Sequence, residues 1–418
     1  MLQRYLSGKS RPGWRERWGV LPDALRRQPD CRPRLWMHAV SAGEVVAAVP
    51  ILKELRVRLP DFRILFSVIT PAGHEMAAQQ AAPFVDAIFY FPFDLPWVAR
   101  RVARTIRPQA FVSLESELWP NVLHALKQQG AATVMVNGRI SERNFRRARR
   151  MGSLAGWVLS HVDRLLMQSE GDAERVRALG GGHLDPRRVA VLGNSKFDQE
   201  ITPLSAAEIQ ALRTELKLPE AAPVFVAGST RSPEEEAQVL EAYNRMRARF
   251  PDLCLIMAPR HIQRAEEVVA AARATGLAPV RRTHLAEAGA PVRQIVLDTI
   301  GELAKVYAVA TFAFVGNSFP PVVKGGGQNI LQPLAHGKPV LFGPRTATIR
   351  SEAALAIEAG VGFRVEDGKA LAAEGIRLLE NPAERQAIEA RALALMAANR
   401  GVSARYAEAV AELAQTVP

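Results

Sequence analysis

The chain has 418 residues, of which 48% are hydrophobic and 23% are charged, so a disordered or low-complexity protein is excluded. This length exceeds the size at which a single hydrophobic core usually stops growing, and the sequence therefore predicts two domains. With 54 basic and 42 acidic residues the net charge is +12, which favours anionic partners: phosphates, acidic sugars, an anionic membrane or nucleic acid.

Residues 1–20 mix aromatic and aliphatic side chains with arginines and a lysine. This blend suits peripheral contact with lipid headgroups, and a frayed basic segment is the alternative. No apolar run approaches the ~20 residues of a membrane-spanning helix. Cys31 and Cys254 are far apart in the sequence, which argues against a disulfide framework and favours the cytoplasm.

Residues 21–200 alternate apolar strands with amphipathic helices, the pattern of a parallel sheet covered by helices on both faces. The predicted strands are 34–40, 63–69, 87–91, 110–115, 133–137 and 164–169, and the predicted helices are 45–59, one after Pro71, 95–106 and 118–129. A polar, proline-containing segment at 199–205 is the best candidate for a domain boundary.

Residues 206–418 repeat this α/β alternation, so the sequence predicts two Rossmann-like domains. The expected strands are 223–229, 253–261, 294–298 and 311–315, and the expected helices are 234–249, one ending at Thr275, and an alanine-rich helical stretch over 368–416. Whether the final helix packs back on the first domain stays open. Because parallel sheets bind ligands at the carboxyl ends of their strands, we expect the chemistry at strand ends, on the two sides of one cleft.

The segment 316–344 is predicted to run from a strand through a glycine-rich loop and a short helix into another strand. Three glycines at 325–327 would place N–H groups at a helix start near Gln328, which attracts phosphate. Asn329 and Gln332 are three apart, so both could face a sugar's hydroxyls from the first helical turn. A tight loop between two core elements is the alternative.

Glu44 follows the first predicted strand and lies in the first turn of the next helix. There the helix dipole is expected to keep its carboxylate ionised. An ionised glutamate at a strand end can accept a proton from an attacking hydroxyl. The alternative is structural, because Ser41 and Glu44 have the spacing of a capping box.

Glu115 and Glu117 stand at another strand end, where strand alternation would place both carboxylates on one side. They could act as acid and base, orient a sugar, or cap the next helix. Lys196, Arg260 and His261 add positive charge at strand ends, where a leaving phosphate would need neutralisation. No cluster of histidines or cysteines has metal-ligand spacing, so no metal is expected.

Six arginines lie between residues 139 and 150, with Glu142 as the only acidic residue among them. This run is either a solvated helical face or a surface for a phosphorylated or membrane-bound acceptor. Phe145 is its only aromatic residue, and sparse aromatics disfavour a nucleic-acid partner.

The chain resembles the 3-deoxy-D-manno-octulosonic acid (Kdo) transferases over roughly residues 34–345. The resemblance is carried, in order, by HAVSAGEVVAAVPILKEL, FSVITPAG, ESELWPN, NGRISERNFRR, GNSKFD, GSTR, APRH, DTIGEL and GGGQNILQPLAHGKPVLFGP. The family implies the two-domain GT-B fold. It also implies inverting, metal-independent transfer of Kdo from CMP-Kdo to a lipid A precursor in lipopolysaccharide biosynthesis, at the cytoplasmic face of the inner membrane of Gram-negative bacteria.

The resemblance also implies roles for individual residues. Glu44 would be the general base, while Glu115 and Lys196 would stabilise the transition state. Donor binding, with no separate cofactor, would fall to Pro259, Arg260, Ile300, Gly301, Glu302, Asn329, Ile330, Leu331 and Gln332.

The chain departs from the family pattern in two places. The family commonly carries His where Gln328 stands and Glu where Gln332 stands, and a neutral glutamine would weaken a contact to the donor by roughly 1 kcal/mol. About fourteen residues precede the RERWG element, where the family carries an apolar anchor, so peripheral or weak anchoring is expected. The rival interpretations are another GT-B transferase that uses a UDP-sugar, and a membrane-associated binding protein without turnover.

Overall fold

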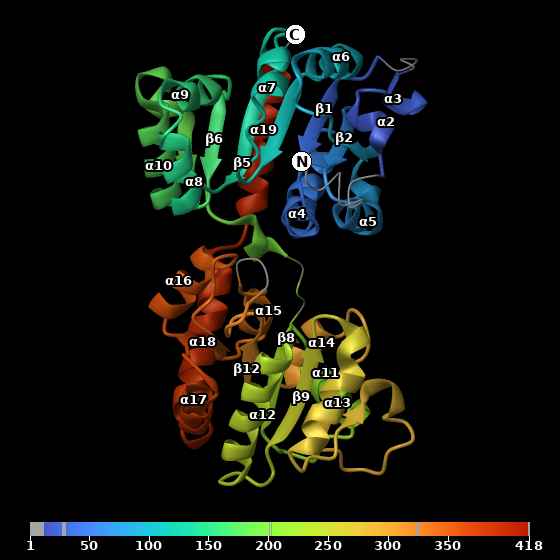
Figure 1. The fold of residues 1–418 in the computed structure, drawn as a ribbon, viewed down its shortest axis with the longest axis vertical. Coiled ribbons are helices and arrows are strands. Elements are labelled where there is room, and N and C mark those ends of the chain that lie inside the picture. Colours follow the sequence, from blue (N-terminus) through green and yellow to red (C-terminus); the bar gives the residue numbers. More distant parts are fainter. Residues whose placement is uncertain (1–11, 27–30, 200, 202, 323–325, 417–418) are drawn as a thin grey trace. The chain divides into compact units, whose positions relative to one another are not determined.

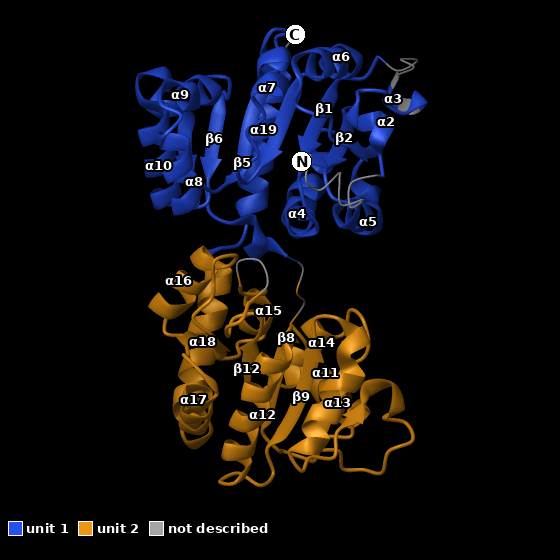
Figure 2. Cartoon of the chain, in the orientation of Figure 1, with its two compact units in different colours: residues 1–199, 399–418 blue, residues 200–398 orange. Residues whose placement is uncertain are grey.

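The computed structural model describes residues 12–26, 31–199, 201, 203–322 and 326–416 (Figure 1). It divides into unit 1, residues 1–199 and 399–418, and unit 2, residues 200–398 (Figure 2). Residues 1–11 of the predicted headgroup-contacting segment lie outside the described residues. The sequence assigns 206–418 to the second domain and leaves open whether the final helix packs back on the first. Residues 399–418, which include this helix, belong to unit 1.

Unit 1 is built on a seven-stranded parallel sheet in the order β3-β2-β1-β4-β5-β6-β7. Its strands are β1 Arg34–His38, β2 Arg63–Val68, β3 Ala87–Tyr90, β4 Ala110–Leu114, β5 Ala132–Gly138, β6 Arg164–Met167 and β7 Val189–Val191. Its α-helices are α2 Trp14–Arg17, α3 Asp23–Arg26, α4 Ala42–Arg58, α5 Pro71–Gln80, α6 Pro96–Ile106, α7 Pro120–Lys127, α8 Glu142–Arg149, α9 Ser153–Ser160, α10 Glu170–Gly180 and α19 Val402–Thr416.

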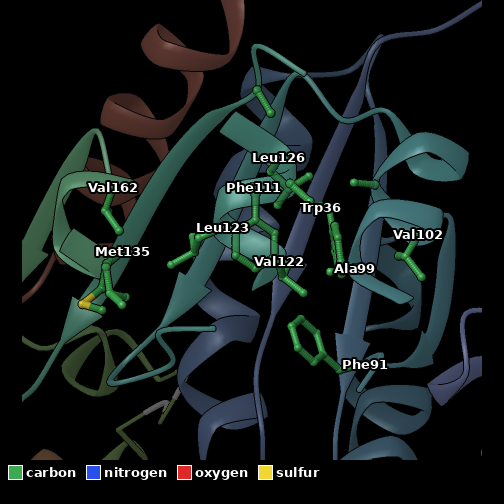
Figure 3. Packing of buried hydrophobic residues seen from close by; sticks show 14 of the residues in the cluster. Trp36, Phe91, Ala99, Val102, Phe111, Val122, Leu123, Leu126, Met135 and Val162 are labelled. Carbon is green, nitrogen blue, oxygen red and sulfur yellow. The ribbon is translucent and has the colours of Figure 1, made fainter. Parts of the chain in front are cut away.

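Two hydrophobic layers cover the faces of this sheet. On one face α6, α7 and α9 pack against inward side chains that include Trp36, Phe111 and Met135 (Figure 3). On the other face α4 and α19 pack against the alternate residues of the same strands. Every residue of β1, β4 and β5 is buried, as expected for strands covered on both faces.

Residues 12–20 form part of unit 1. The Arg17 side chain is fully buried and lies 4.7 Å from the centre of the Tyr90 ring. The Glu16 carboxylate accepts a hydrogen bond from the Tyr90 backbone N–H at 2.6 Å. These contacts fix the RERWG element against the end of β3.

Unit 2 repeats the architecture with strand order β10-β11-β9-β8-β12-β13-β14, all parallel. Its strands are β8 Val224–Thr230, β9 Cys254–Pro259, β10 Val280–Arg281, β11 Gln294–Val296, β12 Phe312–Val315, β13 Val340–Phe342 and β14 Gly362–Arg364. Its α-helices are α11 Ala206–Glu215, α12 Pro233–Arg247, α13 Ala265–Ala274, α14 Leu303–Val306, α15 Leu331–Ala335, α16 Arg350–Glu358, α17 Gly368–Glu380 and α18 Pro382–Ala398.

Local sequence signals set several helix starts. The Ser205 hydroxyl and the Glu208 carboxylate form a capping box at α11. The Ser232 hydroxyl accepts from the Glu235 backbone N–H, and Pro233 occupies the first position of α12. α12 therefore begins shortly after the end of β8.

Candidate functional site

Glu44 lies in the first turn of α4, just beyond the carboxyl end of β1. Its carboxylate oxygens accept hydrogen bonds from the Val40 backbone N–H at 2.8 Å and from the Ser41 hydroxyl at 3.2 Å. Ser41 is the N-cap residue of α4, but its side chain accepts no capping hydrogen bond. The suggested capping box is therefore absent, and the two contacts instead orient the half-buried carboxylate.

The pKa of Glu44 is raised to about 8, first by burial and then by the negative charges of Glu115 and Glu117. The hydrogen bonds from Val40 and Ser41 oppose this shift without cancelling it. The expectation that the helix dipole keeps Glu44 ionised is wrong. A helix N-terminus contributes at most ~2 kcal/mol, whereas burial beside like charges can move a pKa by several units.

Glu115 directly follows β4, and its backbone is left-handed, with φ at +55°. This conformation costs a non-glycine residue about 1–2 kcal/mol. Since Glu115 is not extended, strand alternation does not position it. Instead its carboxylate pairs with Lys196, with Oε1 and Nζ 3.6 Å apart.

Glu117 completes a group of three interacting carboxylates. Its pKa is raised to about 7 by burial and by Glu115. The structure thus brings Glu44, Glu115, Glu117 and Lys196 into one electrostatic group. Glu117 is not among the residues to which the family resemblance gives a role. Such a group can hold a proton near neutral pH, which is the property required of a general base.

The segment that carries Lys196 is held by side chains that the sequence analysis does not identify. The Ser195 backbone N–H donates to Asn137 Oδ1 at 3.0 Å, and the Ser195 hydroxyl donates to the Ala47 carbonyl of α4 at 3.0 Å. The Tyr406 hydroxyl of α19 donates to the Gly193 carbonyl at 2.6 Å. Asn137 has φ at +52°, a conformation in which asparagine is enriched. An asparagine at a strand end is therefore the sequence signal that could have identified this residue.

In unit 2, Glu235 organises the loops after β8 and β12. Its buried carboxylate accepts hydrogen bonds from four backbone N–H groups, at 3.0 Å from Arg231, 2.8 Å from Asn317, 2.9 Å from Ser318 and 3.1 Å from Phe319. Glu235 has no recognisable signal in the sequence, because a glutamate in the first helical turn usually needs no partner beyond the helix itself.

Arg231 follows β8, while Arg260 and His261 follow Pro259, the buried last residue of β9. The pKa of His261 is lowered by burial and then by the positive charges of Arg231, Arg260 and Arg264. Arg264 is neutralised by Glu236, at 2.8 and 2.9 Å. The side chains of Arg231 and Arg260 form no ion pair with any part of the chain that the structure describes, so their charges can meet an anion.

Ile300, Gly301 and Glu302 form a turn before α14. The Ile300 side chain is 84% exposed, and Gly301 has φ at +91°, which favours glycine. Glu302 pairs with Arg282 at 3.0 Å and accepts from the Thr299 hydroxyl. An exposed apolar side chain next to a fixed carboxylate is available to a ligand.

The expected helix at Gln328 begins later, with α15 at Leu331. The Asn329 side-chain oxygen accepts from the Leu331 backbone N–H at 3.0 Å. Asn329 and Gln332 therefore do not share the first helical turn, and that expectation is wrong. Ile330 and Leu331 are buried in the core, and Gln332 is half-buried.

The described glycines of the 325–327 loop are required by packing. Gly326 and Gly327 have φ at +72° and +87°. A Cβ at Gly326 would lie 2.6 Å from the Arg345 carbonyl, and one at Gly327 would lie 2.6 Å from Ile349. The close approach is thus to the chain's own 345–349 segment. An open cavity of about 470 Å³ adjoins it, lined in part by Arg345 and Arg350.

Two absences hold for the residues that the structure describes. No helix there is both long and apolar enough to cross a bilayer. No group of three or more histidines, cysteines, aspartates or glutamates there could hold a metal ion.

Comparisons with known proteins show which family the chain is similar to. The family described as 3-Deoxy-D-manno-octulosonic-acid transferase (kdotransferase) matches residues 12–199. A 3-deoxy-D-manno-octulosonic acid transferase from Bordetella pertussis is 33% identical over 390 residues, which are 90% of this chain and 86% of that protein. One from Haemophilus influenzae is 31% identical over 333 residues, 79% of this chain and 74% of that protein.

Solved structures share the fold. Anabaena HepE in complex with UDP has a TM-score of 0.62 at 15% identity, over 92% of this chain and all of that one. A glycosyltransferase from Rickettsia africae has a TM-score of 0.61 at 12% identity, over 93% of this chain and all of that one. The predicted GT-B fold of two Rossmann-like domains is confirmed. The chain belongs to the 3-deoxy-D-manno-octulosonic acid (Kdo) transferases, a family of glycosyltransferases.

Proposed function

We propose that this transferase moves Kdo from CMP-Kdo to a hydroxyl of a lipid A precursor in lipopolysaccharide biosynthesis, with inversion at the anomeric carbon and with Glu44 as the general base. The observation that carries the proposal is the half-buried Glu44 carboxylate, oriented by Val40 and Ser41 and with its pKa raised to about 8. A base is most effective when its pKa lies close to the working pH. Family membership supports Kdo as the transferred sugar, and CMP-Kdo as donor and a lipid A precursor as acceptor are part of the proposal.

In this mechanism the ionised Glu44 removes the proton of the acceptor hydroxyl. The acceptor oxygen forms a bond to the anomeric carbon of Kdo as the bond from that carbon to the CMP phosphate oxygen breaks. CMP leaves with the electron pair of the broken bond, and Glu44 keeps the proton until it passes to solvent. Attack from the face opposite CMP inverts the configuration.

Positive side chains would balance the charges of this step. Lys196, held 3.6 Å from Glu115, can stabilise negative charge near the reacting centre of unit 1. Arg231 and Arg260 lie at strand ends of unit 2 with their charges available to the CMP phosphate. We propose that these cations take the place of a metal ion. Ile300, Gly301, Glu302, Asn329 and Gln332 are proposed as further donor contacts.

Replacing Glu44 by Gln tests the base assignment directly. Transfer should fall by at least 10²-fold, because a neutral amide cannot accept the proton, while CMP binding measured by calorimetry should be unchanged. The matched control is Glu54→Gln, near the other end of α4, where Glu54 pairs with Arg58. Wild-type turnover in Glu44→Gln would remove Glu44 from the mechanism.

The donor is tested by mass analysis of products formed from CMP-Kdo or from UDP-sugars with a lipid A precursor. We expect product from CMP-Kdo and none from the UDP-sugars. Product from a UDP-sugar and none from CMP-Kdo would favour the rival transferase. CMP-Kdo binding without any product from the intact chain would favour the rival binding protein.

We further propose peripheral contact with the cytoplasmic face of the inner membrane. Trp14 and Trp18 are 37% and 38% exposed, and both contact Phe93 edge-on, with ring centroids 5.6 and 5.2 Å apart. Exposed tryptophans favour the headgroup layer. Trp14→Ser with Trp18→Ser should weaken vesicle binding. This pair of substitutions is a sharper test than deletion of residues 1–20, because Arg17 and Glu16 are part of the fold.

A further inference from the structure

The open cavity of unit 2 lies between two loops at one edge of the sheet. Its volume is about 470 Å³, and it is lined by residues of the loop after β12 and of the segment after β13. Pockets of roughly 300–1,000 Å³ hold small ligands. Because β12 and β13 are neighbouring parallel strands, both walls lie at the carboxyl edge of the sheet, where open α/β sheets bind their ligands.

The lining of this cavity combines apolar walls with positive charge. Three prolines contribute surface without N–H donors, and none of the described lining residues is acidic. The polar side chains of the lining are those of Arg345, Thr346 and Arg350. Both arginines are exposed, and their side chains pair with no carboxylate among the residues that the structure describes. An arginine can bind the two oxygens of a ligand's carboxylate with two parallel N–H groups.

Exposed arginines often need no partner other than water, so the rigidity of the cavity wall decides their meaning. The Gly343 backbone N–H donates to the Ser318 hydroxyl at 2.9 Å, and the Arg345 backbone N–H donates to the Ser318 carbonyl at 3.0 Å. The Thr348 hydroxyl donates to the Gly327 carbonyl at 2.8 Å. These bonds fix the two walls against each other, so the backbone that carries the arginines is preorganised.

Glu235 connects this cavity to the cations proposed to meet the CMP phosphate. Its carboxylate accepts from the Arg231 backbone N–H and also from the N–H groups of Ser318 and Phe319, which directly precede the cavity wall. β8 and β13 lie on either side of β12, so their ends are roughly 10 Å apart. A ligand whose phosphate lies at the end of β8 can therefore extend into the cavity.

We propose that this cavity, named the Arg345–Arg350 cavity, binds the sugar acid of the nucleotide-sugar donor, with Arg345 and Arg350 on its carboxylate. The assignment rests on the proposed function, which supplies a donor whose sugar carries a carboxylate bonded to the anomeric carbon. Holding that carboxylate also orients the carbon that the acceptor attacks. A neutral sugar offers the two arginines no anion, so the cavity would select for a sugar acid.

The test compares the binding of CMP and of CMP-Kdo to the full chain by calorimetry, without a lipid A precursor. Arg345→Gln and Arg350→Gln should each weaken CMP-Kdo binding about 10-fold, because a hydrogen bond to a charged group is lost, and should leave CMP binding unchanged. Arg345→Lys should fall between the wild type and Arg345→Gln, since lysine keeps the charge but lacks the planar fork.

Two further measurements make the result specific. In transfer assays the KM for CMP-Kdo should rise in the same order as the dissociation constants, while the KM for the lipid A precursor stays constant. The matched control is Arg273→Gln, which removes the same charge from an exposed arginine of α13 and should change none of these values.

Three outcomes would overturn the assignment. CMP-Kdo binding of wild-type strength in both glutamine variants would show that the arginines do not touch the donor. Equal weakening of CMP and CMP-Kdo would make them phosphate ligands. A rise in the KM for the lipid A precursor alone would place a phosphate of the acceptor in the cavity.

Failure of the proposed function would be seen separately, in the wild type. If the intact chain formed no product from CMP-Kdo, the transfer would be refuted. A selective loss of CMP-Kdo binding in Arg345→Gln and Arg350→Gln would in that case still support the cavity as the site of the sugar acid.

Discussion

The reactivity of Glu44 depends on the two carboxylates that face it and on the lysine that partly neutralises them. Burial, Glu115 and Glu117 raise the pKa of Glu44, and Lys196 pairs with Glu115. In the proposed mechanism a neutral Glu44 cannot remove a proton, so the fraction of active enzyme should rise as Glu44 ionises. The charges that raise the pKa of Glu44, the proposed base, therefore also limit the share of molecules in which Glu44 is ionised near pH 7.

The pH profile should report this balance. In the wild type, kcat/KM should rise with pH and level off above about pH 8, where Glu44 is ionised. Glu115→Gln removes a negative charge and should move this limb to lower pH, whatever it does to the maximal rate. Steady-state kinetics from pH 5.5 to 9.5 measure the shift. The control Glu54→Gln should leave the pH limb where it is in the wild type. If Glu115→Gln also left the limb unchanged, Glu115 would not contribute to the raised pKa of Glu44.

The free energy of unfolding should depend on pH in the opposite direction to the activity. The folded-state pKa of Glu44 lies above its unfolded value, so the folded state binds the proton more tightly and loses stability as pH rises from about 4.5 to about 8. Glu44→Gln has no such loss and should have a higher melting temperature than the wild type at pH 9, with a smaller difference at pH 5. Calorimetric scans at both values measure it. An equal difference at both pH values would contradict the raised pKa.

Sequence reasoning placed Glu44, Glu115 and Lys196 at strand ends, because alternation of strands and helices locates those ends reliably. The sequence does not predict the raised pKa of Glu44. That pKa depends on two carboxylates about 70 residues away in the chain, which only the fold brings close to Glu44. Sequence reasoning missed Asn137 and Ser195 for the same reason, since their hydrogen bonds span 58 and 148 residues.

At the scale of elements, loops after β8 and β12 are held by one carboxylate at the start of α12. Glu235 accepts four backbone N–H groups, and a Cβ at Gly316 would lie 2.9 Å from its Oε2. The sequence predicted the strands and α12 but not this anchor. It also placed the start of α15 too early, because Asn329 caps its own turn by accepting from Leu331.

Glu235→Gln should test the anchor. A glutamine keeps one acceptor oxygen and points an NH₂ group at backbone N–H donors, so the free energy of unfolding should fall by about 3 kcal/mol and CMP should bind at least 10-fold more weakly. Urea unfolding and calorimetry with CMP measure the two effects. Glu234→Gln, at the neighbouring exposed position of α12, is the matched control and should change neither. Equal behaviour of the two variants would refute the anchoring role.

At the scale of the molecule, the last helix returns to the unit in which the chain began. α19 contacts α4, β4 and β5, and its buried residues Tyr406, Val410 and Ala414 complete the hydrophobic layer on that face of unit 1. Because α4 carries Glu44 and the Tyr406 hydroxyl holds Gly193 near Lys196, the C-terminal helix supports the candidate base and its neighbouring cation together. Alanine-rich composition predicted the helix, but composition does not specify which core it joins.

Hydrogen exchange can separate the two cores in the intact chain. Tyr406→Ala should cost about 3–5 kcal/mol and speed amide exchange in peptides from α4 and β5, while peptides from β8 and β9 keep wild-type rates. The mirror variant, Tyr307→Ala, removes a tyrosine that is 1% exposed in unit 2 and should give the reverse pattern. If Tyr406→Ala instead loosened β8 and left α4 protected, α19 would belong to the stability of unit 2. Since the turn that opens α4 orients Glu44, the proposed base, Tyr406→Ala should also lower kcat. CMP affinity, which we propose depends on unit 2, should stay constant.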